Sequence, residues 1–369
     1  MQFIRTDELK IGMRLARPIY SKKGVLLFDR NSQLTPQAID SVKNFGLLGI
    51  YILEPAEPLP PMSEEDLEFE RFQTVTVFSI QEEINQILST GRQKRLENVS
   101  DAIIRQYRHI NGRINFYQNL RSRDDFVCRH ALNVAVLCVL ITQRLNVKID
   151  ERTNTVLAAL VHDIGKLNSP VESMYNSRIS DEERQQLWMI QQQGFELIED
   201  ALGIAGVAVK RICMQALKAQ MDFYAGAQSG NPKLQTGAKI LLVANRYDEL
   251  TAMSLNGESE SEIKAIKELL EHPEIYDGNI VQTLIDSVNI IFPGMSVELN
   301  TGEKALVIKT NDKDILKPTV LSFRDNTILD LGHRSNKGIE IVDIMKTMDN
   351  RYIMDNDTLS KLGLGGGKK

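Results

Sequence analysis

The sequence predicts a mainly α fold, in which a helical bundle is flanked by a small N-terminal β-rich module and a C-terminal β module. Between about residues 64 and 272, apolar residues recur with helical spacing. Short apolar runs separated by turn residues occupy both ends of the chain. With 369 residues, of which 42% are hydrophobic and 25% charged, the chain has the composition of a globular protein that can bury a large core.

Residues 1–56 form the predicted N-terminal module, with apolar runs such as GVLLF and LLGIYIL. One short helix is expected inside it, with Thr35 as N-cap, Pro36 at the first helical position and Gly46 just after its end. Four prolines in EPAEPLPPMSEED then mark a boundary. Residues 57–98 are therefore interpreted as a proline-rich linker and a lead-in helix.

Residues 99–290 form the predicted helical domain. Its clearest element is Val127–Leu145, where apolar residues cover most of the helix. The next helix, 151–164, is expected to stop at Gly165. Short apolar pieces split by NTG, NDKD and RDN favour strands in the last third. The remaining boundaries are 291–346 for the C-terminal β module and 347–369 for a flexible tail.

Charge and cysteine content exclude several classes. The chain has 44 Lys and Arg against 49 Asp and Glu, so a net charge of −5 disfavours bulk binding to nucleic acid. No apolar run reaches about 18 residues, so no membrane span is expected, and the N-terminus has no apolar signal-peptide core. Buried reduced thiols in a cytoplasmic protein are the simplest account of the three cysteines, Cys128, Cys138 and Cys213.

One group of residues indicates chemistry. His162 and Asp163 end one predicted helix, Lys166 follows one turn later, and His130 lies on the apolar side of the preceding helix. Two antiparallel helices would bring His130, His162 and Asp163 together, and two imidazoles with a carboxylate suit zinc, iron or manganese. A bound metal would bring the pKa of a water near neutrality. Lys166 could then hold a phosphate oxygen.

Plainer interpretations of the same residues stay open. A single histidine on an apolar helix face, such as His130, is often only a core residue. Asp163 with Lys166 or His162 could be an ion pair near the helix end. The other histidines receive no role: His109, His272 and His333.

Several ordered motifs resemble a known family over most of the chain. DDFVCRHALNVAVL, ALVHDIGKL and TGAKILLVANRYDELTA resemble the HD superfamily of metal-dependent phosphohydrolases and, within it, the HD-GYP subgroup. That resemblance implies an HD-type helical bundle and hydrolysis of cyclic di-GMP at a centre of two or three metals. It also implies that His130, His162 and Asp163 are metal ligands and that Lys166 contacts phosphate.

The sequence departs from the family pattern at the other expected ligands. The histidine of the His-Pro motif falls on Ile190, and residues 214–220 contain no histidine or carboxylate. The Gly-Tyr-Pro loop is replaced by YAGAQSGNP, and the aspartate expected after ILLVA is Asn245. The resemblance then implies a weak or vestigial first metal site built from His130, His162, Asp163 and Asn245. Ile190 and Gln215–Lys218 are expected to line its far wall.

The sequence thus predicts a degenerate HD-GYP-like signalling protein without cyclic di-GMP hydrolysis, acting as a nucleotide sensor or a protein-interaction scaffold. One alternative is an active metal-dependent phosphohydrolase, a cyclic di-GMP phosphodiesterase, using His130, His162 and Asp163 with Lys166. Another is a purely structural assembly protein. The expected cofactor is none, or one weakly bound Fe, Mn or Zn ion. A cyclic dinucleotide and a signalling protein are the expected partners, and the oligomeric state stays open.

Overall fold

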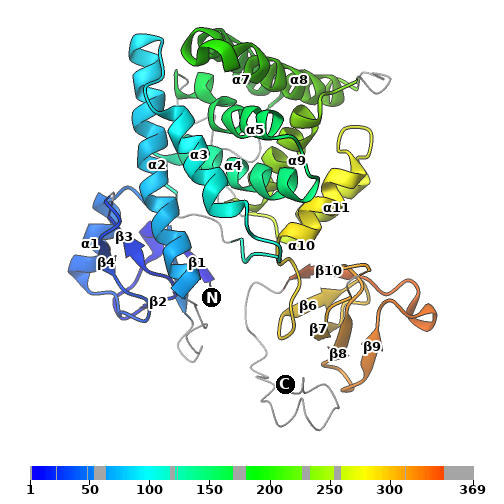
Figure 1. The fold of residues 1–369 in the computed structure, drawn as a ribbon. Coiled ribbons are helices and arrows are strands. Elements are labelled where there is room, and N and C mark those ends of the chain that lie inside the picture. The colour runs from blue at the N-terminus through cyan, green and yellow to red at the C-terminus, as the bar shows by residue number, and fades with distance from the viewer. Residues whose placement is uncertain are drawn as a thin grey trace.

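A computed structural model of the chain has a helical domain with a small β module on either side of one end (Figure 1). The predicted fold class is confirmed. The proposed linker, the segment replacing the Gly-Tyr-Pro loop and the C-terminal tail lie wholly or largely outside the described residues. The structure describes residues 2–21, 23–47, 49–53, 64–116, 121–122, 124–168, 180–226, 233–252, 259–311 and 313–344.

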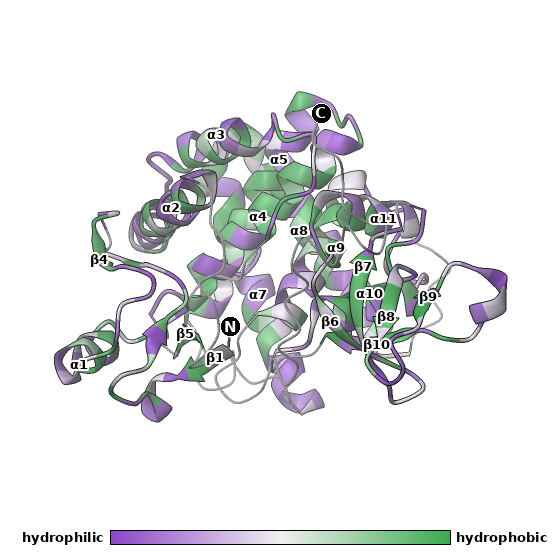
Figure 2. Cartoon of the chain, turned by 90° about the horizontal axis from the view of Figure 1, so that it is seen from below, coloured by the Kyte–Doolittle hydropathy of each residue, from purple (hydrophilic) through white to green (hydrophobic). Residues whose placement is uncertain are grey.

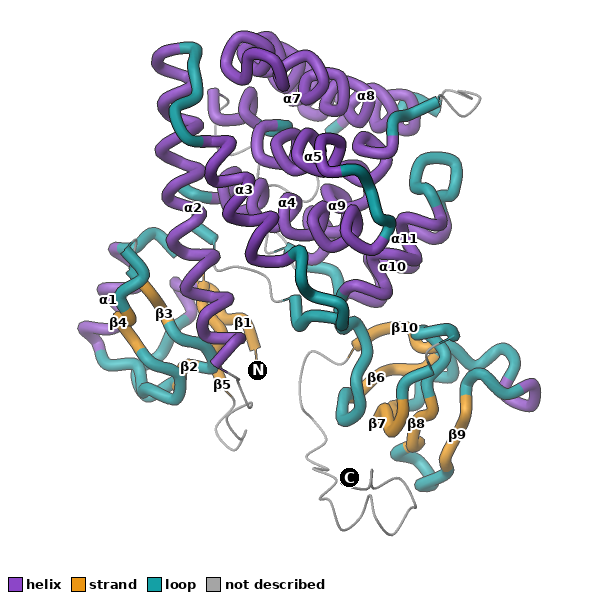
Figure 3. The backbone as a smooth tube through the Cα atoms, in the orientation of Figure 1, coloured by secondary structure: helices purple, strands orange, loops and turns teal. Residues whose placement is uncertain are grey.

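The N-terminal module combines a three-stranded sheet of order β1-β5-β2 with a separate hairpin of β3 and β4 (Figure 3). Its helix begins as predicted: the Thr35 side chain accepts a hydrogen bond from the amide of Ala38, and Pro36 is the first helical residue. The elements are β1 Gln2–Arg5, η1 Thr6–Glu8, β2 Arg14–Leu15, β3 Ile19–Tyr20, β4 Leu26–Phe28, α1 Pro36–Asn44 and β5 Gly49–Leu53.

Helix α4 is the centre of the helical domain, and every residue from Val127 to Thr142 is buried. Figure 2 shows it as an apolar element enclosed by other helices. The described helices of this domain are α2 Glu64–Thr90, α3 Leu96–Tyr107, α4 Phe126–Arg144, α5 Ile149–Val161, η2 Ile164–Asn168, α7 Asp181–Leu202, η3 Gly203–Ala205, α8 Gly206–Tyr224, α9 Thr236–Thr251, α10 Glu262–Glu271 and α11 Gly278–Ser287.

By length and hydropathy alone, α4 could cross a membrane, which the sequence prediction did not anticipate. Its most apolar window has a mean hydropathy of 1.6 and is 89% buried inside the fold. Helices from the whole domain surround it, including α2, α3, α5, α9 and α11. The apolar character of α4 is therefore accounted for by its place in the protein core.

The two ends of the chain join the helical domain differently. Helix α2 carries Val77, Ile80 and Ile84 into the main core and also pairs through Glu70 with Arg17 of the N-terminal module. The C-terminal sheet has the order β10-β6-β7-β8-β9, and most of its buried apolar residues belong to the same core as the helices. Its strands are β6 Ser296–Leu299, β7 Lys304–Lys309, β8 Thr319–Ser322, β9 Ile328–Asp330 and β10 Ile341–Ile344, with η4 Arg334–Asn336 between the last two.

Helix α7 approaches the turn η2 with almost no space between the two backbones. A Cβ atom on Gly194 would lie 2.5 Å from the amide nitrogen of Gly165, and one on Gly165 would lie 2.1 Å from the carbonyl oxygen of Ile190. Gly165 therefore serves a close helix contact and lies inside η2, whereas the helix predicted to stop at Gly165 ends earlier, at Val161. Because η2 follows directly after Asp163, this contact places α7 against the candidate site.

We expect Gly194→Ala to lower the free energy of unfolding by about 3 kcal/mol, since overpacking against rigid backbone has no flexible neighbour to absorb it. Urea denaturation of both proteins measures the change. Gly278→Ala is the matched control because a Cβ there meets nothing within 4 Å. Equal stability of the Gly194→Ala variant and the parent would contradict the close contact.

Candidate metal centre

Three helices bring the predicted site residues together in the core. His130 comes from α4, His162 caps the end of α5 with Asp163 directly after it, and Asn245 comes from α9. All four side chains are buried. Ligand atoms of His130, His162 and Asp163 lie within 4.8 Å of one another. The expected convergence of these three residues is confirmed.

The hydrogen bonds around the two imidazoles fix which ring nitrogens carry protons. Nδ1 of His130 lies 2.6 Å from a carboxylate oxygen of Asp248, and Nδ1 of His162 lies 2.8 Å from the carbonyl oxygen of Ala159. Both partners accept, so both Nδ1 atoms donate. In the neutral rings the Nε2 atoms then carry lone pairs. These two Nε2 atoms face each other at 3.2 Å.

Asn245 adds a third acceptor at the same point. Its Oδ1 lies 2.8 Å from Nε2 of His130 and 2.9 Å from Nε2 of His162. Its amide nitrogen is directed elsewhere and donates to Glu249 at 2.9 Å. Three lone-pair atoms with no proton between them repel one another unless a cation or a proton joins them. The arrangement therefore fits a metal ion.

The spacing of the donor atoms fits the same interpretation. Asp163 places its carboxylate oxygens 3.7 Å from Nε2 of His130 and 3.6 Å from Nε2 of His162. A tetrahedral ion with bonds of about 2.1 Å separates its ligand atoms by about 3.4 Å. The four residues could hold one ion with two nitrogen and two oxygen ligands, a mixed set suited to zinc, iron or manganese.

A fully buried carboxylate supports His130 from behind. Asp248 receives hydrogen bonds from His130, from Arg121 at 2.6 Å and from Asn133 at 2.8 Å. Burial alone would raise the pKa of Asp248, but Arg121 and His130 hold it below its ordinary value. An ionised Asp248 fixes the His130 tautomer. It also directs Nε2 of His130 toward Nε2 of His162 and Oδ1 of Asn245.

Both oxygens of Asp163 already have cationic or amide partners. Lys166 donates to Oδ2 at 2.7 Å, and Gln191 of α7 donates to Oδ1 at 2.5 Å. Burial alone would raise the pKa of Asp163, but Lys166 and the two histidines hold it below its ordinary value. Burial lowers the pKa of His162 despite the opposing charge of Asp163. At neutral pH the centre therefore combines an ionised carboxylate with a neutral His162.

The far wall of the site differs in part from the sequence expectation. A cavity of about 20 Å³, the volume of roughly one water molecule, lies beside His162 and Asn245. Ala216 and Leu217 line it as expected, but Gln191 takes the place expected for Ile190. The backbone carbonyl of Ile190 instead lies against Gly165, where it would clash with any Cβ atom.

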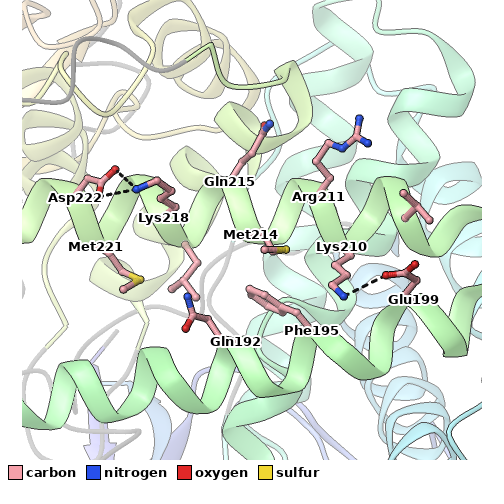
Figure 4. Close-up of a pocket in the computed structure, with 12 residues that line it drawn as sticks. Gln192, Phe195, Glu199, Lys210, Arg211, Met214, Gln215, Lys218, Met221 and Asp222 are labelled. Atoms are coloured by element: carbon pink, nitrogen blue, oxygen red, sulfur yellow. Dashed lines mark hydrogen bonds and ion pairs between the residues drawn. The ribbon is translucent and has the colours of Figure 1, made fainter.

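Gln215 and Lys218 also lie elsewhere than predicted. They line a groove of about 540 Å³ on the outer side of α7 and α8, together with Met214 and Met221 (Figure 4). The prediction treated Gln215–Lys218 as one wall, whereas consecutive helical residues face different directions. Only two of these four residues can therefore face the metal centre.

Three residues bonded to the candidate group or its supporting carboxylate escaped the sequence prediction. Asp248 follows Asn245 by three positions, so it shares a helix face with a predicted ligand, and that spacing could have identified it. Gln191 neighbours the residue chosen by counting from Glu183. Arg121 is separated from Asp248 by 127 positions, and no local pattern connects them.

Comparison with known proteins assigns the region that holds these residues. Residues 115–280 match the family model described as HD domain. This region is an HD domain. The predicted membership of the HD superfamily is thereby confirmed, and all four donor residues of the candidate centre fall inside the domain.

The chain as a whole is similar to two known proteins over more residues than this domain contains. Over 232 residues it is 22% identical to the cyclic di-GMP phosphodiesterase PA4108 of Pseudomonas aeruginosa, covering 62% of this chain and 54% of that protein. The chain thus spans about half the length of this curated relative. An HDG"Y"P protein from Bdellovibrio bacteriovorus, Bd1817, aligns with a TM-score of 0.43 and 17% identity, covering 77% of this chain and 98% of the other.

Proposed function

We propose that this chain is an HD-GYP-like cytoplasmic signalling protein that binds one divalent metal ion and does not hydrolyse cyclic di-GMP. The observation that carries the proposal is that both carboxylate oxygens of Asp163 already accept hydrogen bonds from other side chains. A carboxylate that bridges two metals must offer one oxygen to each ion. Here Gln191 holds one oxygen and Lys166 the other. With the first ion on one oxygen, a second ion would have to displace the donor that holds the other.

The neighbouring residues offer no replacement for a second metal site. The α8 side of the small cavity consists of Cys213, the amide side chain of Gln220, and the apolar Ala216 and Leu217. The potential ligands on this side are the neutral amide of Gln220 and a thiol, and burial raises the pKa of Cys213 well above its ordinary value. A protonated thiol is a poor metal ligand. The described residues thus support a centre with one ion.

The retained residues divide their tasks around that ion. When bound, a divalent ion supplies Lewis acidity and a water of lowered pKa. His130, His162, Asp163 and Asn245 would hold it, and Asp248 orients His130. Lys166 neutralises Asp163 and leaves a single positive charge where a second ion would have two. Cleavage of a phosphodiester would therefore lose much of its charge stabilisation.

The ligand is proposed from the relative rather than from the cavity. PA4108 is named as a cyclic di-GMP phosphodiesterase, which supports a cyclic dinucleotide as the ligand sensed by this chain. A cavity of about 20 Å³ holds one water and not a dinucleotide. A nucleotide would have to bind at the surface of the site or after a movement of α7, consistent with a sensor or scaffold.

A one-metal phosphohydrolase is the second candidate function. The complete group of His130, His162 and Asp163, with Lys166 beside it, favours this alternative. The signalling protein and the phosphohydrolase would both bind one metal ion, so metal content does not distinguish them. Hydrolysis of a substrate does distinguish them.

The test is an assay of cyclic di-GMP hydrolysis with the full chain loaded with Mn²⁺ or Fe²⁺. We expect no product above the blank that contains metal alone. Equilibrium dialysis of cyclic di-GMP with the same samples then distinguishes a sensor, which binds it, from a scaffold. Metal-dependent turnover that Asp163→Ala abolishes would favour the phosphohydrolase and overturn the proposal.

A gain-of-function variant tests the reason given for the missing activity. Gln191→His, Ala216→His and Asn245→Asp together place ligand types at three positions around Asp163. We expect the triple variant to bind more metal per chain than the parent. The matched control replaces Gln191→His with Gln192→His, because Gln192 lies on the outer groove of α7.

A further inference from the structure

A second, larger cavity lies where the N-terminal module meets the helical domain. Its volume is about 400 Å³, within the range of small-molecule sites. The N-terminal module contributes residues around Arg17 and Phe45, α2 contributes one face, and the start of α4 closes it. It shares no lining residue with the candidate metal group. Figure 1 shows the module beside the lower half of α2.

One buried side chain in this cavity lacks a partner. Gln73 of α2 is 3% exposed, and among the described residues its Nε2 atom has no hydrogen-bond partner. An unsatisfied buried donor is unfavourable. Its neighbours on the same face of α2, Thr74, Phe78 and Gln81, also line the cavity. The cavity therefore presents a donor whose hydrogen bond an acceptor atom of a ligand would complete.

A second donor comes from α4. Nε of Arg129 donates to Asp125 at 2.6 Å, and Asp125 also accepts from the amide of Ser122 at 2.7 Å. The described residues provide no partner for the two terminal nitrogens of Arg129, although only 8% of this residue is exposed. Asp125 thus holds the guanidinium in place and leaves its outer edge for a ligand.

The charge of the lining disfavours an anion. Two arginines face three carboxylates, and each arginine is already paired, Arg17 with Glu70 and Arg129 with Asp125. Asp124 at the exposed rim has no ion-pair partner in the described part of the chain. A phosphate would meet a net charge of −1. A neutral ligand with both an acceptor and a donor suits this lining better.

Aromatic side chains complete the lining. Phe45 and Tyr20 come from the N-terminal module and Phe78 from α2. Aromatic faces favour flat ligands, which stack on them or pack against their edges. We propose that this cavity binds a neutral, planar heteroaromatic molecule with a ring carbonyl beside a ring N–H, as in oxopurine or oxopyrimidine nucleosides. The carbonyl accepts from Gln73 and Arg129, and the ring N–H donates toward the carboxylates.

The test uses inosine and adenosine as a matched pair. Inosine carries a ring carbonyl beside a ring N–H, and adenosine carries an amino group in place of that carbonyl. Calorimetric titration of the full chain should show inosine binding at least tenfold more tightly than adenosine. Uridine distinguishes oxopurine from oxopyrimidine ligands. If uridine binds as well as inosine, the ring carbonyl and N–H are sufficient for recognition. If uridine does not bind, the ligand is an oxopurine.

Gln73→Leu tests the assigned donor. We expect it to weaken inosine binding at least tenfold while raising the Tm of the ligand-free protein, since it removes an unsatisfied buried group. A packing defect would lower the Tm instead. Gln86→Leu on the same helix, outside the cavity, should change neither quantity. Phe78→Leu should also weaken inosine. The proposal is overturned if inosine does not bind at millimolar concentration, if adenosine binds equally, or if Gln73→Leu leaves the affinity unchanged.

Discussion

Replacing Asp248 with alanine is expected to lower the free energy of unfolding by about 3–5 kcal/mol, the range found when one partner of a buried ion pair is removed. Arg121 is 1% exposed and would keep its charge in the core after losing the carboxylate that lies 2.6 Å from it. His130 and Asn133 would lose their acceptor as well. A surface ion pair should contribute far less, typically below about 1 kcal/mol.

Chemical denaturation of the metal-free protein measures this difference. Asp286→Ala is the matched control, because Asp286 pairs with Arg113 at 3.4 Å and its side chain is 43% exposed. Asp248→Asn should fall between the two variants, since it keeps a hydrogen-bonding side chain but removes the charge. A loss for Asp248→Ala no larger than that of the control would show that Arg121 does not depend on Asp248.

The same carboxylate predicts a pH dependence with a defined sign. The pKa of Asp248 is lower in the folded protein than its ordinary value. Its contribution to stability is therefore complete above about pH 4 and is lost as the pH falls toward the lowered pKa. Asp163 has a lowered pKa and acts in the same direction. The difference in free energy of unfolding between the parent and the Asp248→Ala variant should therefore shrink as the pH is lowered from 7 to 3.

Local patterns in the sequence were sufficient for the helices and for the central pair of ligands. The Thr35 cap, the apolar face of α4 and the His162-Asp163 dipeptide are all short-range signals, and each leads to the element seen in the structure. His130 could be added because its helix face was predictable. Its role still required a second helix to lie antiparallel to the first.

The remaining contacts depend on distances that no local pattern encodes. Counting along α7 from Glu183 chose Ile190, one residue before the side chain that reaches Asp163. One residue in a helix rotates the side chain by about 100°, so a small error in register selects a different face. The contact between Gly165 and Gly194 sets that register, and the two residues are far apart in the sequence. The interface cavity likewise needed both domains in place.

The structure also bears on the proposed absence of a second metal site in this HD domain. The side built from α4, α5 and α9 retains two histidines, a carboxylate and the supporting Asp248. On the α7 side, Gln191 and Lys166 bind the carboxylate that a second ion would share. These contacts stabilise Asp163 without a second metal. Under the proposed function, these contacts would compensate locally for the loss of a second metal ion.

Metal binding should depend on both histidines. We expect the chain to bind one Mn²⁺, Fe²⁺ or Zn²⁺ ion, and His162→Ala or His130→Ala to weaken that binding more than about 100-fold, because even residues that only orient a ligand contribute about 10–100-fold. Equilibrium dialysis with elemental analysis gives the stoichiometry and the affinity. His272→Ala is the control, since His272 lies at the surface and pairs with Glu274.

The Asn245→Asp variant distinguishes two interpretations of the four residues, a metal site and a hydrogen-bonded cluster in the core. A carboxylate here should bind a divalent ion about tenfold more tightly than the neutral amide, a gain of about 1.4 kcal/mol. Without metal the same change should destabilise the protein, because Asn245 donates to Glu249 at 2.9 Å and an aspartate would repel it. The Tm of the variant should therefore fall below that of the parent without metal and rise more when metal is added. If Asn245→Asp lowered the Tm equally with and without metal, the four residues would be a hydrogen-bonded core cluster and not a metal centre.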